Sequence, residues 1–518
     1  MSPKTAASPQ QEHALLLAST FVIAICGLVY ELLAGTISSY LLGDSVYQFS
    51  LVIGLFMAAM GVGSFISRYI NTHLLDAFIV VQLFIALVGG TSALVLFQAF
   101  ALIDNYTAFL VLELLVIGAA VGLEIPLVIR ILQSHQILKV NVSNVLTVDY
   151  LGALFASLLF PLVLVPQLGL IRTGVLFGLF NALVAGLAIW TFRAELHRRS
   201  VLVAGVISCT VVLSVALVKA DSIMGFFESR LFAGDVIHAT TTPYQRIVIT
   251  RNEAAVNLFI NGALQFSSLD EYRYHEALVH PIMSLSRRGH DILVLGGGDG
   301  MAVREVLKHP QVQQITVVDL DPAVTALFKQ NELLRSLNSD SLNDPRVKII
   351  NQDAWQFLES QRDKYDVVIL DLPDPHNLSL SKLYSRSFYT LLTQHLNADS
   401  LIVTQATSPV FATEAFWSIA KTLRAVSSPF HLEEKLQVQP YHAYVPSFGQ
   451  WGFVMAAAHL PSWDLIDLKV PTRFLDKDVL GSMIDFPPDI SAIDVEINTI
   501  LKHPLPKYYE RGWSQWYE

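Results

Sequence analysis

Several aspartates in the second half of the chain stand just after short apolar runs. They are Asp319 after 315–318, Asp353 after 347–350, and Asp371 with Asp374 after 367–370. Short apolar runs are typical of buried strands, and in open α/β sheets ligands bind beyond the carboxyl ends of such strands. We therefore expect these carboxylates to gather at one edge of a sheet, where they could hold ribose hydroxyls or cationic groups.

A glycine-rich turn stands before the first of these aspartates. The apolar run 292–295 leads into Gly296, Gly297, Gly298 and Gly300, and the helix-like segment 302–308 follows. A strand, a glycine turn and a helix allow the backbone to approach a nucleotide closely and to present amide groups to it. With Asp319 placed to grip the ribose, the pattern predicts a nucleoside-binding, doubly wound sheet of the Rossmann-like, methyltransferase type.

Asp299 lies inside the glycine turn itself. Its charge would repel the carboxylate of S-adenosylmethionine and attract the lone ammonium of decarboxylated S-adenosylmethionine, by on the order of a few kcal/mol at ~4 Å. Asp371 and Asp374 add negative charge where a second amine could lie. Because a polyamine is protonated at neutral pH, a carboxylate must hold the cation and accept a proton as the amine attacks.

Composition divides the chain into two parts. Over 518 residues, 53% are hydrophobic and the net charge is −10, and the mean hydropathy is +0.48. The apolar excess lies in the first 220 residues or so, where charges nearly balance, so the remainder is acidic. An acidic part argues against nucleic acid and suits a cationic ligand. Cys26 and Cys209 both lie in apolar stretches, which leaves no disulfide framework and no thiolate zinc site.

The first part reads as a multi-pass membrane domain, 1–220. We expect seven spans, at about 14–37, 48–70, 77–101, 107–132, 146–167, 170–192 and 200–219, each long enough to cross a bilayer. Acids inside such spans are costly and suggest function, so Glu31 and Glu124 are candidates for a polycation path, and Glu113 less so. The alternative is that each is protonated or bonded to a neighbouring helix.

Three further segments complete the predicted organisation. Residues 221–288 form a linker helix and a small β domain, in which Asn261-Gly262 signals a hairpin. Residues 289–485 form the Rossmann-like domain, and residues 486–518 form a C-terminal extension packed on it. Nothing in the spacing of His, Cys and acidic residues suggests a metal site.

Residues of about 235–485 resemble the spermidine synthase family of polyamine aminopropyltransferases. The matching stretches are Thr242-Pro-Tyr-Gln245, 258–265, 270–281, Gly296-Gly-Gly-Asp-Gly300, 304–309, 344–347, 403–406 and 449–453. So many ordered matches are far more specific than any single motif. The apolar spans resemble the membrane-fused branch of that family.

The resemblance implies a role for each matching residue. Gln245 and Asp319 would bind the nucleoside, and Gly296 and Gly298 would let it approach the backbone closely. Asp353 and Ala354 would contact the adenine. His275 and Asp299 would contact the aminopropyl or polyamine part, Asp371 would accept the proton, and Asp374 would hold the far amine. Tyr244, Tyr274, Gln405 and Tyr444 would line the pocket. The implied reaction joins decarboxylated S-adenosylmethionine and putrescine, giving spermidine and methylthioadenosine, in a homo-oligomer held in membrane lipid.

The sequence departs from the family's pattern directly after Asp371. Leu372 and Pro373 replace two serines, and 376–380 replaces the run that closes over the substrate. The acids are retained, so chemistry is expected, while the acceptor amine is left open. The alternatives are an S-adenosylmethionine-dependent methyltransferase and a membrane transporter or sensor that only binds polyamine. Each acid taken singly could also simply cap a helix.

Two arguments disagree about the side of the membrane. With seven spans, the positive-inside rule applied to the basic loops near Arg68, 130–139 and 193–199 puts the N-terminus in the cytoplasm and the catalytic domain outside. Decarboxylated S-adenosylmethionine, as the resemblance implies, is made in the cytosol. Because the charge bias rests on few residues, we expect an inner-membrane protein with a cytoplasmic catalytic domain.

Overall fold

The computed structural model describes residues 9–42, 45–103, 105–132, 138–231, 234–430 and 433–517. The chain forms two compact units, Met1–Val236 and Ile237–Glu518. The predicted order, a helical part followed by a small β sheet and a Rossmann-like sheet, is confirmed.

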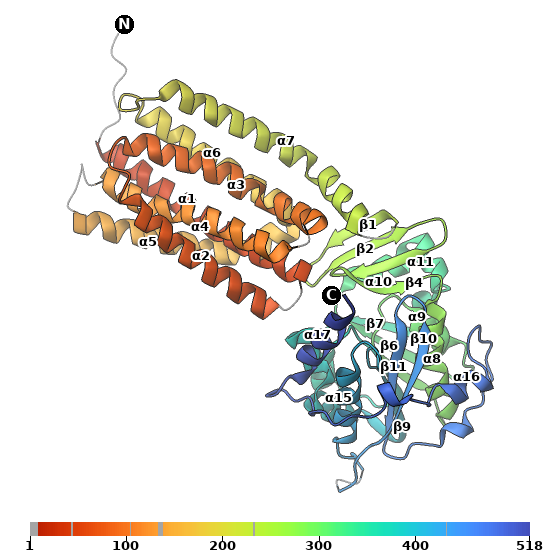
Figure 1. The fold of residues 1–518 in the computed structure, drawn as a ribbon. Coiled ribbons are helices and arrows are strands. Elements are labelled where there is room, and N and C mark those ends of the chain that lie inside the picture. Colours follow the sequence, from red (N-terminus) through yellow and green to blue (C-terminus); the bar gives the residue numbers. More distant parts are fainter. Residues whose placement is uncertain are drawn as a thin grey trace. The chain divides into compact units, whose positions relative to one another are not determined.

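The N-terminal unit is a bundle of long apolar helices (Figure 1). They are α1 (Pro9–Leu42), α2 (Ser45–Ser67), α3 (Leu74–Leu102), α4 (Tyr106–Leu132), α5 (Leu138–Leu159), α6 (Val165–Thr191) and α7 (Arg199–Leu231), with the π-helix η1 (Phe160–Leu164) between α5 and α6.

 Close packing in this bundle depends on glycine. A Cβ at Gly63 would lie 1.9 Å from the carbonyl oxygen of Ala119, and one at Gly122 would lie 2.1 Å from that of Met60. Glycine at these two positions therefore lets the backbones of α2 and α4 touch, as in packed membrane helices.

Six helices in the described residues are long and apolar enough to cross a membrane. The difference from the seven predicted spans lies in Asn141–Thr191, a continuous 51-residue run that takes in α5 (Leu138–Leu159) and α6. Gly169 interrupts this run with φ 73° and ψ 176°, which is not helical. At about 1.5 Å per residue, such a run is far longer than one bilayer crossing needs.

One of the two acids singled out in the predicted spans lies inside the bundle. Glu124 on α4 is buried, and its Oε1 accepts a hydrogen bond of 2.5 Å from Gln82 on α3. Glu31 and Glu113 are half-buried. Glu124 thus has the bonded neighbour that the alternative reading required, and a polycation path through Glu31 and Glu124 stays a prediction.

The C-terminal unit begins with a four-stranded sheet in the order β1-β2-β3-β4. Its strands are β1 (Asp235–Thr241), β2 (Arg246–Arg251), β3 (Val256–Ile260) and β4 (Ala263–Ser267). Asn261 and Gly262 join β3 to β4 with φ 50° and 83°. Positive φ at both residues is what a type I′ hairpin turn requires, so the predicted hairpin is present.

The larger sheet has seven strands in the order β10-β11-β9-β8-β5-β6-β7. They are β5 (Asp291–Gly296), β6 (Gln314–Asp319), β7 (Val347–Asn351), β8 (Tyr365–Asp371), β9 (Leu396–Gln405), β10 (Gln437–Val445) and β11 (Gly449–Ala457). Strands β5 to β9 run parallel, while β11 pairs antiparallel with β9 and β10. The chain passes from β5 to β6 and β7, then returns to β8 on the other side of β5. A crevice for a ligand is expected at this reversal.

Helices cover both faces of the larger sheet. They are α8 (Glu271–Leu285), α9 (Met301–Leu307), α10 (Pro322–Gln330), α11 (Glu332–Leu337), α12 (Ala354–Ser360), α13 (Leu378–Ser381), α14 (Arg386–Thr393), α15 (Thr413–Arg424), α16 (Lys477–Ser482) and α17 (Pro504–Tyr517). Short 3-10 turns are η2 (Ser341–Asn343), η3 (Lys382–Tyr384), η4 (Trp463–Leu465) and η5 (Pro488–Ile490). Along β5, Ile292 and Val294 face one apolar core, and Leu293 and Leu295 face the other. Because β5 packs against an apolar core on each face, its carboxyl end is held in place.

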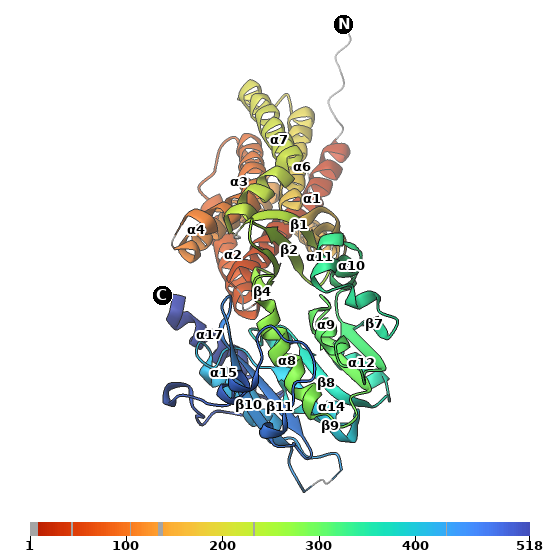
Figure 2. The same ribbon diagram turned by 90° about the vertical axis from the view of Figure 1, so that its right-hand side faces the viewer.

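The last helix packs against the sheet unit. Helix α17 lies beside α15 in both views (Figure 1, Figure 2). Leu505, in its first turn, is fully buried in the core that also contains Phe416 of α15. The C-terminal segment is therefore part of the packed unit.

Candidate active site

The glycine turn after β5 lies directly against the end of β8. A Cβ at Gly296 would stand 2.0 Å from the carbonyl oxygen of Asp371, and the amide of Gly297 donates to that oxygen at 3.2 Å. Gly296 and Gly297 have φ of 83° and 63°, a region that favours glycine. Glycine is therefore required at position 296, because any side chain there would collide with the backbone of Asp371.

Asp319, at the end of β6, is held by backbone amides. Gly298 donates to its Oδ2 at 3.0 Å and Asp321 donates to its Oδ1 at 3.0 Å. Burial raises the pKa of the Asp319 carboxyl to about 6, against the opposing effect of these two hydrogen bonds. The glycine turn and the predicted ribose-binding acid therefore form one bonded unit.

Gln245 reaches the same region from the small sheet. It lies in the turn between β1 and β2, where its amide donates to the hydroxyl of Thr242 at 3.1 Å. That hydroxyl in turn donates to Asp321 at 2.7 Å. The turn that carries Gln245 is thus tied to the residue two positions after Asp319.

Asp353 and Ala354 start α12, after β7. The Asp353 side chain accepts the amide of Gln356 at 3.1 Å, and the Lys382 ammonium lies 3.4 Å away. Asp353 therefore caps a helix, as the alternative reading of these acids expected. Ala354 is buried.

The charges of Asp299 and His275 shift each other's pKa. Burial raises the pKa of Asp299 to about 6, with His275 opposing and Asp371 adding to the shift. Asp299 Oδ1 also accepts the amide of Met301 at 2.8 Å. The glycine turn thus carries a half-buried carboxyl whose charge depends on the groups around it.

His275 is buried on α8, which rules out a solvent-facing side chain. Its Nδ1 lies 2.8 Å from a carboxylate oxygen of Glu271, and Arg304 contacts both oxygens of Glu271 at 2.9 Å. Burial alone would lower the pKa of His275, but the hydrogen bond and charge of Glu271 raise it to about 9. His275 is therefore an imidazolium at neutral pH, beside acids at the strand ends.

Asp371 has a partner unlike those of the other acids. The Tyr274 hydroxyl donates to its Oδ1 at 2.7 Å, while its Oδ2 lies toward Gly297, 3.1 Å from where a Cβ of that glycine would be. Asp319, Asp353 and Asp299 accept backbone amides, whereas the Asp371 side chain accepts a hydrogen bond from a phenol. Helix capping thus does not account for Asp371.

Asp374 is held by three uncharged donors. Gln405 donates at 3.2 Å, Thr407 donates at 3.2 Å, and the hydroxyl of Tyr509 also donates. Burial raises the pKa of Asp374 to about 6, and the three hydrogen bonds oppose that shift. The carboxylate is thus oriented without a cation among these partners.

The two residues that depart from the family's motif are fixed by their carbonyls. Tyr384 donates to the carbonyl oxygens of Leu372 at 3.1 Å and Pro373 at 3.0 Å, and Gln405 donates to that of Leu372 at 2.7 Å. Asp371 and Asp374 are therefore kept at opposite ends of a rigid, bonded segment.

Two residues that were predicted to line the pocket lie outside this cluster of buried side chains. The side chains of Tyr244 and Tyr444 are exposed, at 52% and 54%. Conversely, sequence reasoning missed Thr407 and Tyr509. Thr407 stands just after the matched stretch 403–406, which was a local signal, whereas Tyr509 lies far along the chain in the extension.

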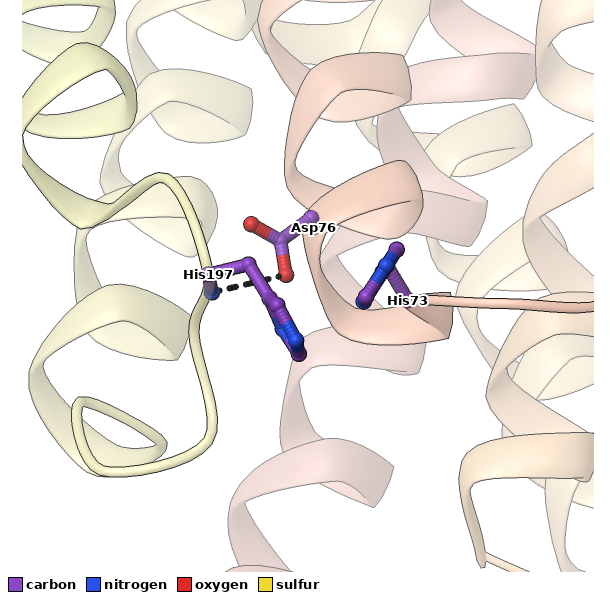
Figure 3. Close-up of side chains that lie close together, drawn as sticks. All are labelled: His73, Asp76 and His197. Atoms are coloured by element: carbon purple, nitrogen blue, oxygen red, sulfur yellow. Dashed lines mark hydrogen bonds between the residues drawn. The ribbon is translucent and has the colours of Figure 1, made fainter.

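The expectation that no metal-ligating set exists rested on spacing along the chain. In the N-terminal unit, however, His73, Asp76 and His197 have ligand atoms within 4.8 Å of one another (Figure 3). Asp76 accepts the amides of His197 at 3.3 Å and Arg198 at 3.0 Å. These bonds clamp the loop before α7 to the first turn of α3.

Comparisons with known proteins point the same way as the site. The sequence model of the Spermine/spermidine synthase domain matches residues 271–465. Polyamine aminopropyltransferase 1 of Ralstonia nicotianae is 48% identical over 98% of this chain and 97% of its own. The polyamine aminopropyltransferases of Leptospira interrogans and Mycobacterium tuberculosis are 44% and 36% identical, over 96% and 97% of this chain and 98% and 97% of their own.

Among solved structures, a spermidine synthase of Thermotoga maritima is 20% identical, with a TM-score of 0.43, over 54% of this chain and 87% of its own. The relatives match the helical unit as well as the sheet unit, because they are aligned over nearly their whole length. Because polyamine aminopropyltransferases that are 36–48% identical to this chain align with nearly its whole length, the chain belongs to the polyamine aminopropyltransferase family.

Proposed function

We propose that the protein transfers the aminopropyl group of decarboxylated S-adenosylmethionine to putrescine, giving spermidine and methylthioadenosine. The observation that carries this proposal is the pair of carboxyl groups at the reversal of the sheet. Asp299 lies in the glycine turn, and Asp371 lies at the end of the adjoining strand β8. Both are anionic groups where the co-substrate's ammonium and the attacking amine would meet.

The nucleoside would bind across the ends of β5, β6 and β7. Asp319 would accept ribose hydroxyls, and Gln245 would approach from the turn tied to Asp321. Asp353 and Ala354, at the start of α12, would meet the adenine. The bonded glycine turn supports this proposal, because it leaves room for the sugar and sulfur beside the backbone.

Transfer would proceed by direct attack of the amine nitrogen on the methylene carbon bound to sulfur. The new C–N bond forms as the C–S bond breaks. The electron pair of the C–S bond stays with the sulfur, so the sulfonium becomes the neutral thioether of methylthioadenosine. Because the acceptor amine is protonated at neutral pH, the Asp371 carboxylate would take one proton from it as the attack begins, which frees the nitrogen lone pair, and would later pass that proton to solvent. Tyr274 would hold that carboxylate in line with the attack through its 2.7 Å bond.

Asp374 would hold the far ammonium of the acceptor. Its partners Gln405, Thr407 and Tyr509 are uncharged, so no protein cation competes with the substrate for it. With Asp371 near the reacting amine, two carboxyls would fix both ends of a diamine.

The helical unit would anchor the enzyme in the cell membrane. We propose seven crossings, with α5 and α6 counted separately because Gly169, near the start of α6, has a non-helical backbone. The catalytic unit would lie in the cytoplasm, where its co-substrate is available, and the enzyme would work as a homo-oligomer surrounded by lipid.

The reaction is tested by product analysis on the purified full chain. Decarboxylated and ordinary S-adenosylmethionine are each incubated with putrescine, spermidine and cadaverine, and products are identified by mass. We expect spermidine and methylthioadenosine from the decarboxylated co-substrate. A methylated amine from ordinary S-adenosylmethionine would establish the methyltransferase alternative, and polyamine binding without any product would establish the transporter or sensor.

A further inference from the structure

We propose that the C-terminal helix α17 forms a wall of the acceptor-amine site, and that Tyr509 is the positioning residue that sets where Asp374 holds the far ammonium. The inference rests on the proposed function, and it adds a determinant of acceptor length from outside the matched residues 271–465. Its starting point is the hydrogen bond between Tyr509 and Asp374.

Helix α17 is docked firmly on the segment that follows β9. A Cβ at Gly512 would lie 2.4 Å from the carbonyl oxygen of Phe411, so helix and segment touch backbone to backbone. The ring of Trp513 packs on that of Phe411, with centroids 4.8 Å apart. Arg511 also pairs with Glu414. The position of Tyr509 is therefore set by several contacts besides its own hydroxyl.

The same segment carries the second donor to Asp374. Thr407 has φ 57°, a left-handed conformation that is uncommon for residues other than glycine. Its amide donates to Gln405 Oε1 at 2.9 Å, and its carbonyl accepts the amide of Gly452 at 2.7 Å. A strained residue held this way is a mark of a functional constraint. Here it aims the Thr407 hydroxyl at Asp374.

The C-terminal extension also holds the segment directly after the run 376–380, which departs from the family's pattern. The buried Asn498 donates to the carbonyl of Ser381 at 2.7 Å, and its own carbonyl accepts the amide of Arg386 at 2.9 Å. His376, within the departing run, has its ring 6.2 Å from that of Tyr509. Burial lowers the pKa of His376, so at neutral pH it adds no positive charge beside the amine.

These contacts give α17 a defined part in specificity. The Tyr509 hydroxyl donates to Asp374 and keeps a lone pair that can accept from an ammonium. Moving or releasing Asp374 would change the distance between the two carboxyls that hold the diamine. The chain length of the preferred acceptor should therefore depend on Tyr509, while the co-substrate, which binds at β5 to β7, should not.

The test compares Tyr509→Phe with Tyr508→Phe in the full-length protein. Tyr508 is the matched control, since it is the adjacent residue of α17 and its hydroxyl accepts the amide of Glu496, at 3.3 Å, rather than bonding to Asp374. For Tyr509→Phe we expect the KM for putrescine to rise about tenfold, the usual effect of losing a hydrogen bond to a charged group. The kcat and the KM for decarboxylated S-adenosylmethionine should change less than about threefold, because Tyr509 acts on the acceptor end of the site alone.

Acceptor length is the second readout. The ratio of kcat/KM for cadaverine to that for putrescine should change in Tyr509→Phe and stay at the wild-type value in Tyr508→Phe. Equal behaviour of the two variants, or a fall in kcat alone, would overturn the inference. The two proposals fail differently, because wild-type protein that makes no aminopropyl product refutes the proposed function, whereas active wild type with an unaltered Tyr509→Phe refutes only the role of α17.

Discussion

Tyr274 donates a 2.7 Å hydrogen bond to Asp371, which lies 97 residues further along the chain. The tyrosine is on α8, and its buried ring packs against Phe453 and Trp451, with centroids 5.3 and 6.5 Å away. The phenol is thus held by the sheet's own antiparallel strand β11. A carboxylate fixed by a rigid donor is ready to act without reorganisation, which is what catalysis by a positioned base requires.

Replacing Asp371 with asparagine should abolish most turnover. Asparagine keeps an oxygen that can accept from Tyr274 but cannot take a proton, so we expect kcat to fall ~10²–10⁴-fold. Binding of methylthioadenosine should stay close to wild type. The control is Asp399→Asn, an exposed acid on β9. Near-normal turnover in Asp371→Asn would remove this residue as the base.

Replacing Asp299 with asparagine should narrow the preference for the decarboxylated co-substrate. The amide neither repels a carboxylate nor attracts an ammonium, so the ratio of the two binding constants should fall by about tenfold or more. Calorimetric titration with decarboxylated and ordinary S-adenosylmethionine measures that ratio. If it does not change, Asp299 serves only to shape the turn through its bond to Met301.

Binding of the cationic substrates should release protons near pH 6. Asp299, Asp319 and Asp374 have pKa values raised to about 6 by burial, so each carries a proton part of the time at that pH. An ammonium beside Asp299 or Asp374 favours the ionised carboxylate and lowers its pKa. Calorimetry in buffers of different ionisation enthalpy should therefore find proton release at pH 6 and almost none at pH 8. Uptake of protons at pH 6 would contradict this assignment.

The same three acids affect stability in the unliganded protein. Because their folded pKa values are above the unfolded value of about 3.9, their contribution to stability is fully present below about pH 4 and is lost as the pH rises through 6.

Methylthioadenosine is the control for the measurement of proton release. Because it lacks the ammonium, its binding should release fewer protons than that of decarboxylated S-adenosylmethionine.

The side of the membrane is open to a direct test. A reporter active only in the cytoplasm, fused after Glu518, should be active if the catalytic unit lies there. The matched control is the same fusion to a reporter that works only in the periplasm, which should be silent. The reverse pattern would mean that the basic loops dictate orientation, as the positive-inside rule predicts for seven crossings.

Local patterns in the sequence predicted most of the sheet unit. The apolar runs ending in Asp319 and Asp371 are strands β6 and β8, and Asn261-Gly262 is a hairpin turn. These features depend on neighbours in the chain, because strand burial and positive φ restrict residue type at each position. The gathering of acids at one edge followed from parallel strands, since all of their carboxyl ends lie on the same side.

Partners across long separations were decided only by the tertiary structure. Tyr509 meets Asp374, and His197 meets His73 and Asp76, although no sequence pattern around Tyr509 or His197 indicates either contact. Periodicity tells which face of a helix is buried, but not which other helix or loop covers that face. The sequence by itself therefore determined the fold class and placed the candidate acids at the carboxyl ends of parallel strands. The packing of α17 beside α15, which brings Tyr509 to Asp374, was decided by the tertiary structure, because side-chain contacts between distant segments exist only once the chain has folded.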